Sequence, residues 1–261
     1  MPSALTQAAL AAASGSLVGF SLGLVGGGGS IIAVPLLVYV VGLDDPHLAI
    51  GTSAIAVALN AGVNLASHAR SGNVKWRCAM MFTVTGVAGA YLGSTLGKMM
   101  NGQRLLALFA VLMIAVAGLM LRNRARPGNP AVTLSGENLP KLVASGLAVG
   151  VLSGFFGIGG GFLVVPALVL ATGMPLLNAI ASSLVSVTAF GLTTAANYAV
   201  SGLIHWPIAV LFVGGGILGG LVGARSAGSL ASRRRGLLTS IFSGLILVVA
   251  IYVLFRSRSA F

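Results

Sequence analysis

Charged side chains are scarce in this sequence, and acidic ones are the scarcest. Only 7% of the 261 residues are charged, whereas a soluble domain carries about 25%. Hydrophobic residues make up 57% of the chain, and the mean hydropathy is +1.03. A soluble surface cannot be assembled from this composition. The sequence therefore predicts an all-α integral membrane protein, with lipid as the surrounding solvent.

The three acidic residues, Asp44, Asp45 and Glu137, all fall between apolar segments. Proton and metal-cation pumps usually place a carboxylate inside the membrane, so this absence weighs against a cation as the substrate and leaves anions or neutral solutes. The 15 Lys and Arg residues also fall between apolar segments. Such loop charges are typical of the positive-inside rule, and we expect no nucleic-acid partner.

Several other features are missing. Cys78 is the only cysteine, so no intrachain disulfide can form. No Lys or Arg precedes Arg70, so the first apolar stretch lacks the positive region of a signal peptide and is expected to remain in the mature chain. No nucleophile elbow, HExxH, Walker motif or metal-ligand cluster is present. We therefore expect neither an enzyme nor a bound metal or cofactor.

The chain divides into apolar segments, five in each half. The second segment of each half has about a dozen residues and reaches only about 18 Å, against a hydrocarbon core about 30 Å thick. The first two segments of each half are therefore expected to form a hairpin or a broken pair. The segments span about 5–25, 30–42, 47–69, 76–97 and 104–121, then about 141–157, 161–172, 176–199, 207–227 and 236–255.

The two halves repeat the same residues in the same order. Gly26 and Pro35 recur 131 positions later as Gly157 and Pro166, and after one deletion Trp76 recurs 130 positions later. Matched glycines alone would be weak evidence for a repeat in a chain with 38 glycines, but the matching Pro and Trp residues favour duplication. The predicted division is a first repeat over 1–121, a polar linker over 122–140 and a second repeat over 141–261.

An odd number of crossings in the first repeat would invert the second. With this arrangement 11 basic residues fall on one face and 4 on the other, whereas a parallel arrangement gives 9 and 6. The positive-inside rule thus favours inverted repeats. Secondary transporters commonly combine inverted repeats with interrupted helices and bind substrate near the midplane between the repeats.

A glycine-rich break lies between the first two segments of each half. Irregular backbone at membrane depth is tolerated where it is buried in protein or lines a cavity. A helix starting at about Ser30 or Gly161 would offer free N–H groups and a positive dipole end to an anion. The alternative is that the glycines only permit close helix packing. The candidate binding residues are Gly26, Gly27, Gly28, Gly29 and Ser30 in the first break and Gly157, Gly159, Gly160 and Gly161 in the second.

The third segment of each half is the most polar part within the membrane. Asn60 and Asn64 are four residues apart and share a helix face. Such side chains either line a pathway or form hydrogen bonds between helices and to their own backbone. We include six of them among the candidate substrate-binding residues: Thr52, Ser53, Asn60, Asn64, Ser182 and Ser183.

With these motifs in place, the chain resembles the TauE/SafE sulfite exporter family of bacterial and archaeal membrane proteins. The resemblance rests on Gly23–Pro35 and Ala49–Ser53, and on their counterparts Gly154–Pro166 and Ala179–Ser183. It implies an ion-gradient-coupled permease in the cytoplasmic membrane for small anions such as sulfite, thiosulfate or organosulfonates. The coupling ion would be a proton or sodium, and the glycine motifs with the Thr and Ser that follow them would hold the anion.

Two other functions remain open. The same lining could serve a channel for an anion or a neutral solute. The chain could also be a non-transporting subunit of a membrane complex. Accumulation of substrate against a gradient would favour the transporter over both.

Overall fold

The computed structural model describes residues 4–122, 134–157, 159, 161–233 and 235–256. Most of the predicted linker, residues 123–133, and the candidate residue Gly160 lie outside this description. Every element in the described part of the chain is helical, which confirms the all-α prediction. The elements are α1 (Ala4–Val25), the 3₁₀ helix η1 (Gly26–Ile32), α2 (Ala33–Tyr39), α3 (Pro46–Arg70), α4 (Trp76–Met99), α5 (Gly102–Arg122), α6 (Leu139–Phe156), α7 (Gly161–Thr172), α8 (Leu176–Val200), α9 (Trp206–Arg233) and α10 (Arg235–Arg256).

Six of the helices in the described residues are long and apolar enough to cross a membrane, namely α1, α3, α4, α6, α8 and α9. The second apolar segment of each half forms a short helix, α2 or α7, as its length predicts. Both long helices that follow these short ones are largely buried inside the bundle. The chain is therefore a multi-pass membrane protein with α3 and α8 at its centre.

The start of the short helix in the first half differs from the prediction. We expected a helix from about Ser30, but the α-helical hydrogen bonding begins at Ala33, after a 3₁₀ helix over Gly26–Ile32. Glycine disfavours an α-helix by about 1 kcal/mol relative to alanine. Pro35 has no N–H to donate and is tolerated in the first turn, where it now lies. In the second half the helix begins at Gly161 as expected.

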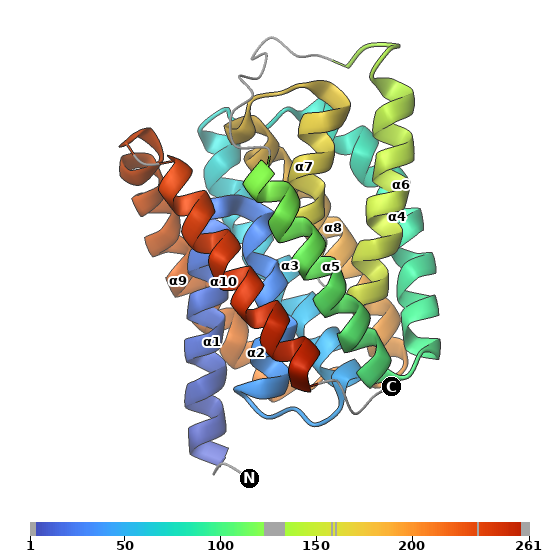
Figure 1. Cartoon of the computed structure of the whole chain (residues 1–261), viewed down its shortest axis with the longest axis vertical. Coiled ribbons are helices and arrows are strands. Elements are labelled where there is room, and N and C mark those ends of the chain that lie inside the picture. The colour runs from blue at the N-terminus through green and yellow to red at the C-terminus, as the bar shows by residue number, and fades with distance from the viewer. Residues whose placement is uncertain (1–3, 123–133, 158, 160, 234, 257–261) are drawn as a thin grey trace.

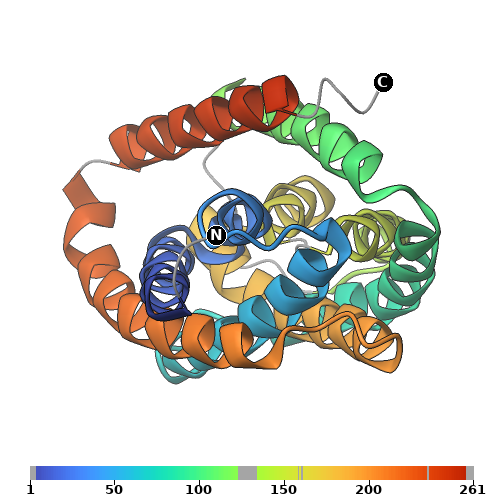
Figure 2. The same ribbon diagram turned by 90° about the horizontal axis from the view of Figure 1, so that it is seen from below.

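Helices from opposite halves of the chain pack side by side. α1 packs along α9, α4 packs along α6, and α3 crosses α8 (Figure 1). In the view of Figure 2, α5 and α10 form an outer layer across one side of the bundle. Both halves of the chain therefore contribute helices to the core of the bundle.

Glycines permit the closest of these contacts. A Cβ on Gly19 would lie 1.9 Å from the carbonyl O of Gly216, and one on Gly150 would lie 2.1 Å from the carbonyl O of Gly86. Small residues commonly bring membrane helices together in this way. The two pairs occupy equivalent positions in the predicted repeat, since Gly150 is 131 residues after Gly19 and Gly216 is 130 after Gly86.

The directions of the helices bear on the predicted inversion. α1 runs upward in Figure 1 from the end where the N-terminus lies, and α6 runs downward toward that end. The contacts of Gly15 with Phe212 and of Gly19 with Gly216 place α9 parallel to α1. Opposite directions of α1 and α6 are what an inverted repeat requires, and we retain the repeat as a proposal.

Candidate functional site

The second glycine break is a left-handed turn between α6 and α7. Gly157 has a φ of 67° and Gly159 a φ of 65°, a region that side-chain-bearing residues rarely occupy. The N–H of Gly157 donates to the carbonyl O of Gly154 and closes α6. α7 then begins at Gly161 with its first N–H groups unpaired within the helix.

This break is enclosed by α3 and α8. The Ser53 hydroxyl donates to the carbonyl O of Gly157, with an O–O distance of 3.3 Å, and to that of Ile50 at 2.9 Å. A Cβ on Gly159 would lie 3.2 Å from Val187 and 3.3 Å from Val57. The structure therefore brings Ser53 to the second break, and any side chain at Gly159 would be both strained and crowded.

Ser153 belongs to this region and was missed from the sequence. It is fully buried on α6, one turn before Gly157, and its hydroxyl has no hydrogen-bond partner within the described part of the chain. A helical serine usually bonds to a carbonyl of the preceding turn. The predicted repeat carried a signal for it, because the equivalent residue in the first half is the apolar Leu22. Ser153 is therefore a buried hydroxyl with unused hydrogen-bonding capacity next to the second break.

The first break differs from the second in form. Gly26, Gly27, Gly28, Gly29 and Ser30 lie in η1, which folds back on α1 so closely that a Cβ on Gly29 would lie 2.4 Å from the backbone N of Leu22. The Ser30 side chain is fully buried. η1 also contacts α7 and α8. The two breaks therefore lie on neighbouring elements, although their backbones differ.

Thr52 and Ser182 have a different environment from Ser53. The hydroxyl of Thr52 accepts a hydrogen bond from the N–H of His205 and donates one to the backbone O of Leu48. The hydroxyl of Ser182 accepts a hydrogen bond from the N–H of Lys75. His205 and Lys75 directly precede α9 and α4. These two hydroxyls thus fix the starts of two long helices.

Asn60 and Asn64 point toward α9 rather than toward the breaks. A Cβ on Gly216 would lie 2.0 Å from the Asn60 amide N, and one on Gly220 would lie 2.9 Å from that of Asn64. The Asn64 amide donates to the backbone O of Asn60. Both amide atoms of Asn60 are buried without a partner in the described residues. Ser183, also fully buried, donates to the backbone O of Ile180.

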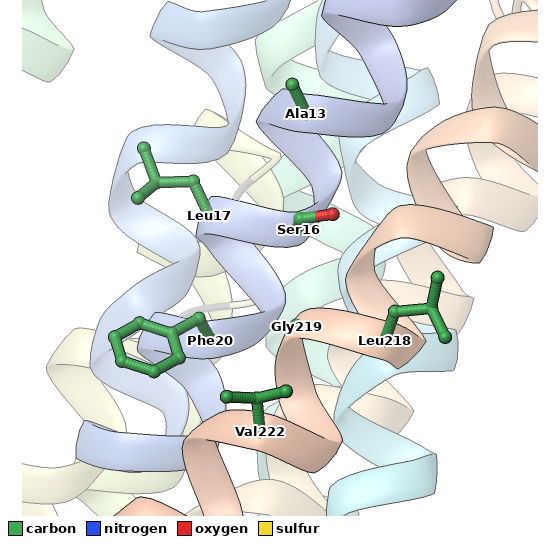
Figure 3. Close-up of a pocket in the computed structure, with 7 residues that line it drawn as sticks. All are labelled: Ala13, Ser16, Leu17, Phe20, Leu218, Gly219 and Val222. Atoms are coloured by element: carbon green, nitrogen blue, oxygen red, sulfur yellow. The ribbon is translucent and has the colours of Figure 1, made fainter.

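An open groove lies elsewhere, on the outer side of α1 and α9. It has a volume of about 480 Å³, and Figure 3 shows its lining side chains. Leu17 and Leu218 are exposed, and the one hydroxyl, that of Ser16, donates to the backbone O of Ala12. This apolar surface suits lipid rather than an anion. The groove is lined by Ala13, Ser16, Leu17, Phe20, Leu218, Gly219 and Val222.

The family described as "Sulfite exporter TauE/SafE" matches residues 11–253. A probable membrane transporter protein of Xylella fastidiosa strain Temecula1 is 52% identical over 94% of both chains. The probable membrane transporter protein YunE of Bacillus subtilis is 29% identical over 80% of this chain and 85% of its own length. No solved structure matches.

The family match covers nearly all the described helices, including both breaks and the helices around them. The relatives' names agree with the six described helices that are long and apolar enough to cross a membrane. The chain therefore belongs to the TauE/SafE family of membrane transporters.

Proposed function

We propose that this protein is a secondary transporter of a small anion, with sulfite, thiosulfate or an organosulfonate as the substrate class, in the cytoplasmic membrane of a bacterium or archaeon. The family description names a sulfite exporter, and the scarcity of acids inside the membrane favours an anion. A proton or sodium ion is the proposed coupling ion. The two halves are proposed to be inverted repeats around the site.

The observation that carries this proposal is the buried Ser153 hydroxyl beside the second break. The first N–H groups of α7 and the hydroxyl of Ser153 are donors, and Ser153 has no partner among the described residues. The Ser53 hydroxyl lies against the same turn. An anion can be held by such neutral donors with help from the positive end of a helix dipole.

Flux measurements in liposomes test the proposal. The purified protein should move labelled sulfite with saturation and accumulate it when an ion gradient is imposed. Ser153→Ala should raise the KM by about tenfold, the effect of losing one hydrogen bond to a charged ligand. Ser53→Ala should weaken transport less directly, by leaving the carbonyl O of Gly157 without its hydroxyl partner. Non-saturating flux without accumulation would indicate a channel, and no flux of any oxyanion would contradict the proposal.

Two leucine substitutions, one at Gly159 in the second break and one at Gly214 as a control, test whether the break belongs to the site. Gly159→Leu should abolish flux because the side chain would meet Val57 and Val187 at a positive φ. Gly214→Leu should transport normally, because a Cβ there has no atom within 4 Å. Normal transport by Gly159→Leu would remove the second break from the site.

A further inference from the structure

Lys98 joins α4 to α8 at the end of the bundle where α4 stops. Its ammonium donates to the backbone O of Asn197 at 2.9 Å, to the side-chain Oδ1 of Asn197 at 2.7 Å and to the Ser201 hydroxyl at 2.8 Å. The Asn197 amide donates in turn to the hydroxyls of Ser94 and Thr95. We call Ser94, Thr95, Lys98, Asn197 and Ser201 the Lys98 clasp.

No counter-charge neutralises Lys98 within this clasp. Its hydrogen-bond partners in the described residues are a carbonyl, an amide and a hydroxyl, and its remaining contact is with the Tyr198 ring, whose centroid lies 5.9 Å from Nζ. The side chain is half-buried. A cation that is partly removed from water attracts an anion more strongly than one in bulk solvent.

Two buried polar atoms next to the clasp also lack partners. The Tyr198 side chain is fully buried and its hydroxyl is unpaired in the described structure, as is Nδ1 of His47. The rings of Tyr198 and His47 have centroids 6.4 Å apart, and Nε2 of His47 pairs with the backbone O of Met100. Buried polar atoms nearly always have a partner, so this region has unused hydrogen-bonding capacity beside an unneutralised cation.

The other charged side chains that the structure describes at this end are exposed. Asp44, Asp45, Arg104 and Arg256 are all exposed, and Asp45 accepts the N–H of His47 as the N-terminal cap of α3. Charges in water are screened by salt, whereas buried ones are screened much less. Among the charged side chains described at this end, Lys98 is therefore the half-buried one that an oxyanion would meet as it leaves water.

The clasp has no counterpart at the other end of the predicted repeat. The offset of 130 that relates Gly93 to Gly223 relates Lys98 to Gly228 and Ser67 to Asn197. The second half thus has a glycine where the first has Lys98, and the first half has a serine where the second has Asn197. A one-sided clasp gives the two ends of the transport pathway different chemistry.

We propose that Lys98 recruits the anion at this end of the pathway. A small oxyanion such as sulfite replaces Asn197 and Ser201 as the partner of the ammonium, and this exchange releases the end of α4 from α8. The proposal rests on the transport function proposed above and adds a second anion-binding position, separate from the glycine breaks.

The test uses Lys98→Gln, which keeps hydrogen-bond donors but removes the charge. In liposomes of zwitterionic lipid, the KM for labelled sulfite should rise by about tenfold, the size of one lost charge-assisted hydrogen bond. Arg104→Gln removes a charge at the same end from an exposed side chain and should leave the KM within about twofold. Asn197→Asp supplies Lys98 with a carboxylate, so flux should fall while the melting temperature rises.

A binding measurement separates this inference from the proposed function. Sulfite should raise the melting temperature of the detergent-solubilised wild type, and Lys98→Gln should lose most of that shift. Wild type that binds sulfite in this way without transporting it would contradict only the transport function. A Lys98→Gln variant with the wild-type KM and the wild-type shift would overturn the role of Lys98, even if it melted at a lower temperature.

Discussion

At the scale of single residues, polar side chains of the same helix have different roles according to the face on which they lie. On α3, Thr52 binds the N–H of His205, Ser53 binds the carbonyl of Gly157, and Asn60 faces Gly216. The hydroxyls of Thr52 and Ser53 therefore hold neighbouring backbone in place. The Asn60 amide makes no hydrogen bond to any described residue, so its presence in the core is a cost to stability.

The cost at Asn60 leads to a prediction. Asn60→Leu has nearly the same shape and removes a buried amide without a partner. We expect the variant to be more stable by about 1 to 3 kcal/mol and to transport more slowly if the amide serves a ligand during the cycle. Thermal unfolding in detergent and sulfite flux would measure the two effects. A less stable variant would show that the amide has a partner in the folded protein.

At the scale of helices, bundle assembly depends on glycines at the crossings. The α1–α9 contact is closest where Gly19 meets Gly216. Gly19→Ala should therefore force the two helices apart and lower the melting temperature by several degrees, while Gly214→Ala should leave it unchanged because no atom lies within 4 Å of a Cβ there. Equal melting temperatures for the two variants would mean that the crossing can relax without loss of contact.

At the scale of the whole molecule, the positive-inside rule predicts the orientation. The loop at 71–75, beside Arg70, should face the cytoplasm, and the loop at 100–101, beside Lys98, should face outward. Ser71→Cys and Asn101→Cys should then be labelled from opposite sides by an impermeant thiol reagent. The native Cys78 is buried and should give little background. Labelling of both from one side would contradict the predicted crossings.

The sequence predicted the helices well because each apolar segment is a local property of the chain. The second break was also predictable, since Gly157 and Gly159 adopt left-handed backbone that glycine tolerates. The rotation of α3 was not predictable, because which face meets α9 depends on where Gly216 and Gly220 lie in space. Ser53 and Thr52 look equivalent in sequence, and only the packing of the neighbouring helices separates them.

The pairing of α1 with α9 and of α4 with α6 has a consequence for biosynthesis. About 180 residues separate the end of α1 at Val25 from the start of α9 at Trp206. During translation α1 enters the membrane long before α9 has been synthesised. Until then, α1 must be surrounded by lipid or bound to an insertion factor. Folding of the first half alone should stall, and a chain split in the linker should become stable only when both fragments are produced in the same cell.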